Sequence, residues 1–262
     1  MNESLLKNPF DSSTLTGVHK NAAIFFSKRK DWVGRRVIDL CCGKGISTMI
    51  LKKLGADVSS YELIPEESLL VEKPTYANIQ KTLPIPDQSV DVVVFQEVIE
   101  HIPNQLHALF EIHRILKPGG ELFLTTPSKS SLQSRLATLI FESENIKFTP
   151  WGSVDGVWGQ NKDEEMYFGH LFLIGIQQLN ALGKSVGFKK TVVHRTELSK
   201  TSMLLLPILF PIIYIFSIRA LYRDLRKAPK GSPYCNEKIE QFKLNISINV
   251  ILSKFTFVSL YK

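Results

Sequence analysis

The 262-residue sequence predicts an α/β fold with a doubly wound, mostly parallel sheet. Strand and helix patterns alternate along its first half, as they do in such folds. Residues 90–95 are rich in β-branched side chains and almost free of polar interruption, as expected of a central parallel strand covered on both faces. The apolar strand at 37–40 also runs directly into a turn that contains Gly43 and Gly45. Such a turn often borders a ligand pocket in this fold class.

The first elements form the pattern of one βαβ unit. Residues 18–30 place apolar side chains on one helical face and lysines on the other, which indicates an amphipathic helix. After the strand at 37–40, residues 46–54 fit a helix and residues 57–61 fit a strand that ends at Glu62. A parallel sheet grows by repeats of this unit.

The later elements continue the alternation with larger interruptions. Residues 104–116 show helical spacing, and the sequence KPGG that follows predicts the end of that helix. Residues 121–125 and 190–194 fit strands, and residues around 175–186 fit a helix. A last apolar stretch at 246–260 predicts a closing strand or strand pair.

Composition and charge restrict the class of protein. With 44% hydrophobic residues the chain can bury a sizeable core, so we expect a globular protein. The net charge of +7 favours anionic surroundings, but the basic residues cluster only locally, and we expect no nucleic-acid partner. Three cysteines offer neither a disulfide framework nor spaced zinc ligands. The first residues lack the pattern of a secretory signal, so we expect a cytoplasmic protein.

Polar candidate residues follow three of the predicted strands. They are Asp39 and the turn at 43–45, then Glu62, then Gln96 and Glu97. Because ligands bind beyond the carboxyl ends of parallel strands, we expect these groups to meet in one site. A carboxylate about 20 residues beyond a glycine turn suits the hydroxyls of a ribose. A nicotinamide dinucleotide would fit the same spacing, but its usual GxGxxG turn is absent.

At these residues the sequence resembles the class I S-adenosylmethionine-dependent methyltransferases. Their first motif is similar to D-x-G-x-G-x-G, and Asp39, Gly43 and Gly45 match it. The resemblance covers roughly residues 30–190, through Glu62, LPIPDQSVDVVVFQEVIEHI, EIHRILKPGGELFLTTPS, Gly169–His170 and Gly187–Phe188. It implies a seven-stranded Rossmann-like sheet and S-adenosyl-L-methionine as the cofactor.

The resemblance also implies roles for the candidate residues. Asp39 and the glycine turn would face the methionine part of the cofactor, Glu62 the ribose, and Gln96 with Glu97 the cofactor near the central strand. Cys41 stands where the family has its first glycine, and its added bulk implies a remodelled turn.

The adenine contact departs from the family pattern. The family often has an acidic residue just before the LP pair, whereas this chain offers Asn78 and Gln80. We expect an amide or backbone contact there, with Gln80 as the candidate.

Two histidines are candidates for catalysis. His101 can act as a general base toward a hydroxyl acceptor, since its ordinary pKa lies near neutrality. His170 follows the irregular segment, where it either reaches the acceptor or starts the next helix. Glu97, Glu100 and His101 are spaced to share one helical face, and some quinone-pathway O-methyltransferases resemble this stretch and bind a divalent metal there. We favour helix-start acids and assign no metal.

An irregular segment at about 127–170 predicts a lid. Its aromatic residues are Trp151, Trp158, Tyr167 and Phe168. They form an aromatic acceptor pocket or, as we favour, hold the lid on the domain.

An apolar appendage follows the predicted core. Its 16 uncharged residues at 203–218 would span about 24 Å as a helix, short of the ~30 Å hydrocarbon core of a bilayer. Pro207 and Pro211 also argue against a spanning helix. Basic residues follow, so residues 203–227 suit peripheral contact with an anionic membrane. A helix docked on the domain or in a dimer interface fits the pattern equally.

The predicted organisation is a methyltransferase core at 1–200, an apolar and basic appendage at 201–232, and C-terminal strands at 233–262 that complete the sheet. The predicted function is methyl transfer to a small-molecule or lipid-linked acceptor, at oxygen, in the cytoplasm or at the inner face of the membrane. Two alternatives are an NAD-dependent oxidoreductase and a non-catalytic membrane-associated scaffold that retains the fold.

Overall fold

A computed structural model describes residues 15–143, 157–160 and 166–262. The chain divides into two compact units. The first comprises residues up to 126 together with 182–192 and 257–262, and the second comprises 127–181 and 193–256. The predicted lid and the predicted appendage therefore contribute to the same unit.

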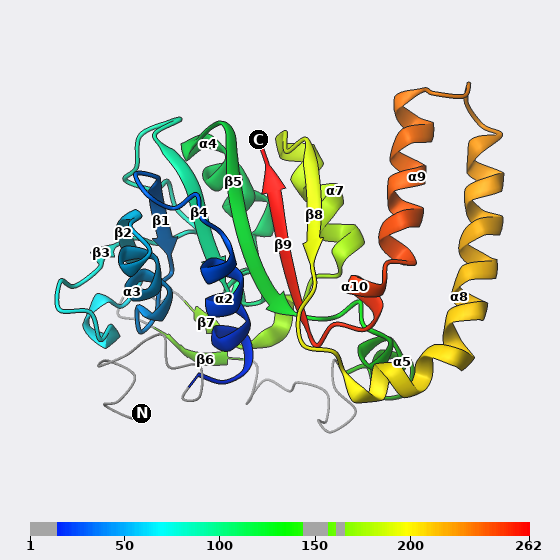
Figure 1. Ribbon diagram of the computed structural model, residues 1–262, viewed down its shortest axis with the longest axis horizontal. Coiled ribbons are helices and arrows are strands. Elements are labelled where there is room, and N and C mark those ends of the chain that lie inside the picture. The colour runs from blue at the N-terminus through cyan, green and yellow to red at the C-terminus, as the bar shows by residue number, and fades with distance from the viewer. Residues whose placement is uncertain (1–14, 144–156, 161–165) are drawn as a thin grey trace. The chain divides into compact units, whose positions relative to one another are not determined.

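A seven-stranded sheet of order β3-β2-β1-β4-β5-β9-β8 organises the first unit (Figure 1). Its strands are β1 (Arg36–Leu40), β2 (Asp57–Glu62), β3 (Thr75–Tyr76), β4 (Val90–Gln96), β5 (Leu116–Pro127), β8 (Lys190–His194) and β9 (Phe255–Tyr261). Strands β1 to β5 pair in parallel, while β9 runs opposite to β5 (Figure 1). The predicted doubly wound, mostly parallel sheet is confirmed.

Helices cover both faces of this sheet because right-handed crossovers lead in opposite directions from its centre. They are α2 (Gly17–Lys28), α3 (Ile46–Lys53), α4 (Gln105–Ile115) and the end of α7 (Ile176–Val186). The predicted elements match these closely. Strand β5 begins earlier than predicted, since the KPGG sequence joins it through a register shift between Val90 and Val92 of β4.

The central strand is buried as its composition predicts. Val92, Val93, Val94 and Phe95 of β4 have no exposed surface. On the neighbouring strand, the ring of Phe123 stacks on Phe25 of α2 with centroids 4.6 Å apart. This apolar core fixes the strands whose carboxyl ends carry the candidate site.

The second unit is largely helical in the residues described. Its elements are α5 (Leu132–Phe141), the antiparallel pair β6 (Val157–Gln160) and β7 (Met166–Phe168), the 3₁₀ turn η3 (His170–Phe172), α8 (Lys200–Leu225), α9 (Pro233–Asn245) and α10 (Ile248–Ile251). Strands predicted at 233–262 are therefore wrong up to residue 254. Ser232 caps α9 by accepting from the Cys235 amide at 3.3 Å, and Pro233 starts the helix, as these residues commonly do.

Helix α8 corrects the prediction for the apolar segment. It runs unbroken for 26 residues through both Pro207 and Pro211, about 39 Å at 1.5 Å per residue. Each proline lacks the backbone N–H that would donate to the carbonyl four residues earlier. Because the two prolines are four residues apart, both missing hydrogen bonds lie on one side of the helix, and the backbone hydrogen bonds on the other side remain. Ser199 caps the helix by accepting from the Ser202 amide at 3.1 Å.

Candidate functional site

The glycine turn after β1 is built from left-handed residues. Gly43 has a φ of +53°, and a Cβ added there would meet no atom within 4 Å. Gly45 has a φ of +82°, and a Cβ there would collide with the side chain of Leu70. Cys41, with a φ of +56°, adopts the same region at the cost that any side chain incurs there. The space beside Gly43 is therefore open, whereas the space beside Gly45 is filled by Leu70.

Glu62 at the end of β2 faces this turn. One carboxylate oxygen accepts from the Gly43 amide at 2.6 Å, and the other accepts from the Leu63 amide at 2.7 Å. A cavity of 220 Å³ lies here, lined by Gly43, Lys44, Glu62, Ile64 and Glu67. The backbone thus fixes a carboxylate at the wall of an open cavity.

Asp39 lies beneath the turn and is only 3% exposed. It accepts a hydrogen bond from the Thr48 hydroxyl at 2.6 Å, and that hydroxyl lies 2.8 Å from the hydroxyl of Ser60. Burial raises the pKa of Asp39 to about 6, while the hydrogen bond from Thr48 opposes this rise. Asp39 therefore ties β1 to the first turn of α3.

Gln96 ends β4, next to β1 in the parallel register that pairs Leu40 with Phe95. Its carbonyl oxygen accepts a hydrogen bond from the Ser47 hydroxyl of α3. Its amide nitrogen is buried and has no hydrogen-bond partner within the described residues. Buried polar atoms are normally paired, so this N–H group points to a ligand acceptor.

Glu97 follows in a left-handed conformation, with a φ of +52°. Its amide donates to the Thr125 carbonyl at 2.9 Å, and its carboxylate accepts from the Thr125 hydroxyl at 2.8 Å. The 3₁₀ turn η2 (Ile99–His101) begins only two residues later. The expectation that Glu97, Glu100 and His101 share a helical face is wrong, because Glu97 lies before the turn.

Glu100 and His101 lie together on η2. Glu100 is fully buried and accepts from the Thr126 hydroxyl at 2.9 Å. Its other oxygen lies 3.9 Å from Nε2 of His101, which is half-buried. A fully buried carboxylate therefore lies beside a partly accessible imidazole.

Gln80 follows the short strand β3 in the sequence. It is exposed, and its backbone amide donates to the buried side chain of Asn78 at 2.9 Å. Its proposed adenine contact stays a prediction.

The two adjacent cysteines show no sign of thiolate chemistry. Burial raises the pKa of both the Cys41 and Cys42 thiols well above the ordinary value. Both are therefore neutral at physiological pH.

The second unit holds His170 and part of the predicted lid. His170 begins η3, and Phe168 packs edge-on against Phe172 with centroids 5.2 Å apart. Trp151 and the side chains of Trp158 and Tyr167 lie outside the described residues, so the aromatic pocket stays a prediction.

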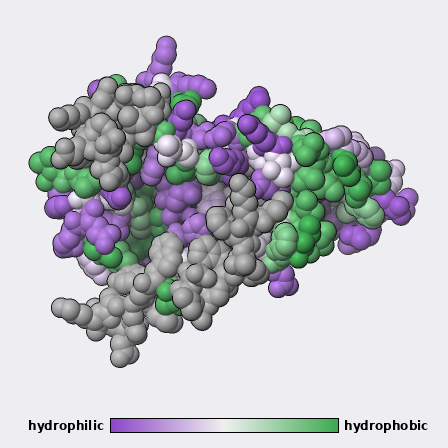
Figure 2. Space-filling model, turned by 90° about the horizontal axis from the view of Figure 1, so that it is seen from below, coloured by the Kyte–Doolittle hydropathy of each residue, from purple (hydrophilic) through white to green (hydrophobic). Residues whose placement is uncertain are grey.

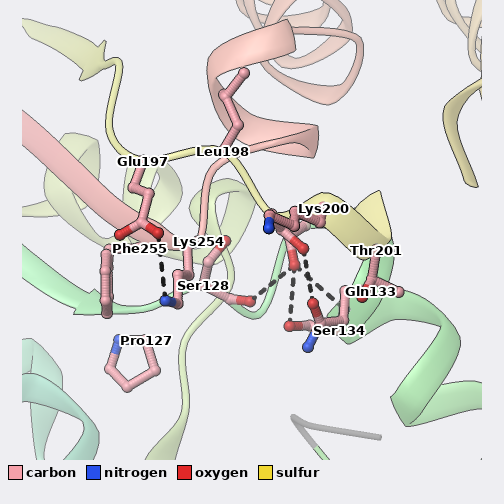
Figure 3. Close-up of a pocket in the computed structure, with 12 residues that line it drawn as sticks. Pro127, Ser128, Gln133, Ser134, Glu197, Leu198, Lys200, Thr201, Lys254 and Phe255 are labelled. Carbon is pink, nitrogen blue, oxygen red and sulfur yellow. Dashed lines mark hydrogen bonds and ion pairs between the residues drawn. The ribbon is translucent and has the colours of Figure 1, made fainter. Parts of the chain in front are cut away.

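A polar cleft of 490 Å³ also lies in this unit (Figure 3). Its lining includes hydroxyls at the start of α5 and α8, where Ser199 donates to the Gln133 side chain at 2.7 Å. Lys254 on its wall lies 3.6 Å from the carboxylate of Glu197. Hydroxyls and ion pairs make this cleft unlike an apolar pocket for an aromatic ring.

Comparison with known proteins identifies the family. Residues 17–193 match the family model described as Methyltransferase domain. The chain belongs to this methyltransferase family. The match covers more than half of the chain, including the ends of β1, β2 and β4, and identifies a class I enzyme fold whose cofactor is S-adenosylmethionine.

Relatives and solved structures agree with this assignment. The methyltransferase is 30% identical over 125 residues to a ubiquinone biosynthesis O-methyltransferase of Xanthomonas oryzae pv. oryzae, covering 44% of this chain and 52% of the relative. It thus spans about half of that relative's length. In fold it is similar to a methyltransferase from Archaeoglobus fulgidus, with a TM-score of 0.51, 15% identity and 92% of each chain covered. It is also similar to a possible histamine N-methyltransferase from Thermotoga maritima, with a TM-score of 0.53, 14% identity and 99% and 93% covered.

Sequence reasoning missed three hydroxyl residues of the methyltransferase site. Ser47 and Thr48 begin α3, and Ser60 lies on β2 opposite Asp39 in the β1–β2 register. The first turn of the helix after a glycine turn could have suggested Ser47 and Thr48. Ser60 carried no signal, because a serine within a strand is common.

Proposed function

We propose that this methyltransferase transfers the methyl group of S-adenosylmethionine to an oxygen atom of a small-molecule or lipid-linked acceptor. The observation that carries the proposal is the meeting of Glu62, the open Gly43 backbone and the buried Gln96 amide at one sheet edge. When bound, the cofactor supplies a methyl group on a positively charged sulfur. The residues of the chain bind, orient and accept a proton.

In this proposal the cofactor residues act through directional hydrogen bonds. The Glu62 carboxylate accepts from the ribose hydroxyls, and the Gln96 amide donates to the cofactor. Asp39 holds the turn in place through Thr48. Cys41, Gly45 and Glu97 shape the surrounding backbone by their left-handed conformations.

His101 accepts the proton from the acceptor hydroxyl at its imidazole. Glu100 positions the ring and stabilises the imidazolium, with 3.9 Å between the two side chains. Methyl transfer from a sulfonium also needs the acceptor oxygen to be oriented toward the methyl group. His170 is proposed as a second contact to the acceptor.

Two observations support oxygen as the methylated atom and a lipid-linked acceptor. The matched relative carries the name ubiquinone biosynthesis O-methyltransferase, and ubiquinone is itself a lipid. Helix α8 leaves apolar side chains exposed, which supports contact with the inner face of the membrane through residues 203–227. No metal is assigned in this proposal.

The test is methyl transfer from isotopically labelled S-adenosylmethionine, with a water-soluble catechol as the first acceptor and a lipid extract of cells as the second. We expect labelled methyl ethers in both. Calorimetry with S-adenosylmethionine and with NAD accompanies the assay. Cofactor binding without label transfer would favour the scaffold, and heat with NAD alone would favour the oxidoreductase.

A further inference from the structure

Helix α8 has an apolar side that is exposed, since none of the described residues of its unit cover it. Its exposed residues Leu204, Ile208, Ile212 and Phe216 recur every four positions along one face and are 76%, 65%, 50% and 67% exposed. Figure 2 shows hydrophobic side chains gathered over this part of the molecule. Among the described residues, α8 is the one helix long and apolar enough to cross a membrane.

The opposite side of α8 packs on α9 (Figure 1). The Asn245 side chain donates to the Ser217 hydroxyl at 2.7 Å, and the rings of Tyr214 and Phe242 lie 6.0 Å apart. Helix α9 is polar, with Glu237, Lys238, Glu240 and Lys243. Helices α8 and α9 therefore form a pair in which α8 is apolar and α9 is polar and suited to water.

The chemistry of one end of α8 indicates what covers the apolar face. Five cations follow the apolar run, at Arg219, Arg223, Arg226, Lys227 and Lys230, against one acid, Asp224. Asp224 already pairs with Lys227 at 3.0 Å. Apolar surface beside an excess of cations matches a bilayer with anionic headgroups. A second copy whose α8 packed in parallel on this one would place the same cations near one another.

The sheet topology limits how α8 meets that bilayer. Strand β8 precedes α8, β9 follows it, and the two strands are neighbours in one sheet. Both ends of the excursion at 195–254 therefore lie on the same side of any membrane. If α8 crossed, α9 would have to cross back with 13 residues, about 20 Å, and with four charges. Neither its length nor its charge permits this.

We infer that α8 is a monotopic anchor that lies in the surface of an anionic membrane without crossing it, while α9 stays on the aqueous side. This inference deepens the proposed function. The membrane contact does not depend on that function, but the role of the anchor in reaching a lipid-linked acceptor rests on it. The anchor would hold the methyltransferase at the surface where such an acceptor lies.

Vesicle binding tests the anchor without cofactor or acceptor. We expect the wild-type chain to sediment with vesicles of phosphatidylcholine and phosphatidylglycerol, and more weakly with phosphatidylcholine alone. The double variant Ile208→Glu/Ile212→Glu should bind at least roughly 100-fold more weakly. The double variant Val33→Glu/Val71→Glu adds the same charges at exposed valines outside the second unit and should bind like the wild type.

The cations are tested separately. Arg219→Gln/Lys230→Gln should weaken binding to the anionic vesicles roughly 25-fold, about fivefold for each side chain, and leave binding to neutral vesicles unchanged. Equal loss on both vesicles, or loss on neither, would contradict the charge complementarity.

The monotopic arrangement has its own measurement. A nitrobenzoxadiazole label on Lys230→Cys is exposed to dithionite, which does not cross the bilayer, with the unsubstituted chain labelled in parallel as the blank. We expect full quenching from outside the vesicles. Protection until detergent is added would overturn the inference. So would wild-type vesicle binding by Ile208→Glu/Ile212→Glu, or a dimer in solution that abolishes vesicle binding.

Methyl transfer to the soluble catechol distinguishes this inference from the proposed function. We expect Ile208→Glu/Ile212→Glu to retain methyl transfer to the catechol and to lose binding to the vesicles. Vesicle binding by a chain that transfers no methyl group would leave the anchor supported and remove the proposed reaction.

Discussion

The site at the glycine turn and helix α8 leave different kinds of surface open. At the turn, specific hydrogen bonds hold the carboxylates of Glu62 and Asp39 in place. The buried side-chain nitrogen of Gln96 lacks a hydrogen-bond partner in the described chain. On α8, whole apolar side chains are exposed and few directional contacts involve them. The difference indicates two kinds of partner: a polar small molecule recognised atom by atom, and a surface recognised by its apolar character and charge.

The largest expected effect is the loss of activity when His101, the proposed general base, is replaced. His101→Asn should lower kcat for the catechol about 100-fold or more, because it removes the proton acceptor, and should leave the cofactor Kd within about twofold. His194→Asn on β8 is the control. A kcat within about fivefold of the wild type would show that directed chemistry at this side chain is not required.

The next effect is a pH dependence of stability from Asp39. Its folded pKa is raised to about 6 from 3.8, so its contribution favours the folded state below about pH 4 and is lost as the pH rises through 6. The free energy of unfolding should fall over that range by up to about 3 kcal/mol relative to Asp39→Asn. Urea unfolding of both proteins from pH 4 to 7 measures the difference, and a constant difference would contradict the burial argument.

A smaller effect is expected at the ribose contact. Glu62→Gln retains the size of the side chain but loses its charge-assisted hydrogen bonds, and the cofactor should bind about 10- to 100-fold more weakly. Calorimetry with S-adenosylhomocysteine measures it. The exposed Glu66→Gln is the matched control and should bind normally. Unchanged affinity of Glu62→Gln would remove Glu62 from the site.

The smallest effect sharpens the contrast with α8. Ile212→Leu preserves apolar area and charge, so vesicle binding should change by less than about twofold. A large loss would mean that α8 is recognised by shape, as a protein partner would recognise it.

Much of the first unit could be predicted from the sequence because its signals are local. The β-branched run of β4, the acid within β1 and the glycines after it each predict their own conformation and position. Parallel topology then brings the strand ends together. The polar contacts between elements, such as Ser47 with Gln96, depend on register and rotamer and left no signal in the sequence.

The second unit was less predictable for a physical reason. Two prolines within an apolar run argue for a break, yet α8 continues because its remaining side keeps its hydrogen bonds. Residues 233–245 begin with Pro233 directly after the cap Ser232, and this helix-start signal carries more information than the expectation of closing strands. Glu97 was placed on a helix because spacing alone does not reveal a left-handed residue.

The most direct test of the cofactor site is a structure of the chain with S-adenosylhomocysteine at saturating concentration. The account predicts the ribose hydroxyls within hydrogen-bonding distance of the Glu62 carboxylate, and the Gln96 amide nitrogen donating to the ligand. A ligand bound elsewhere, or a cavity beside Gly43 filled by side chains of the protein, would contradict it.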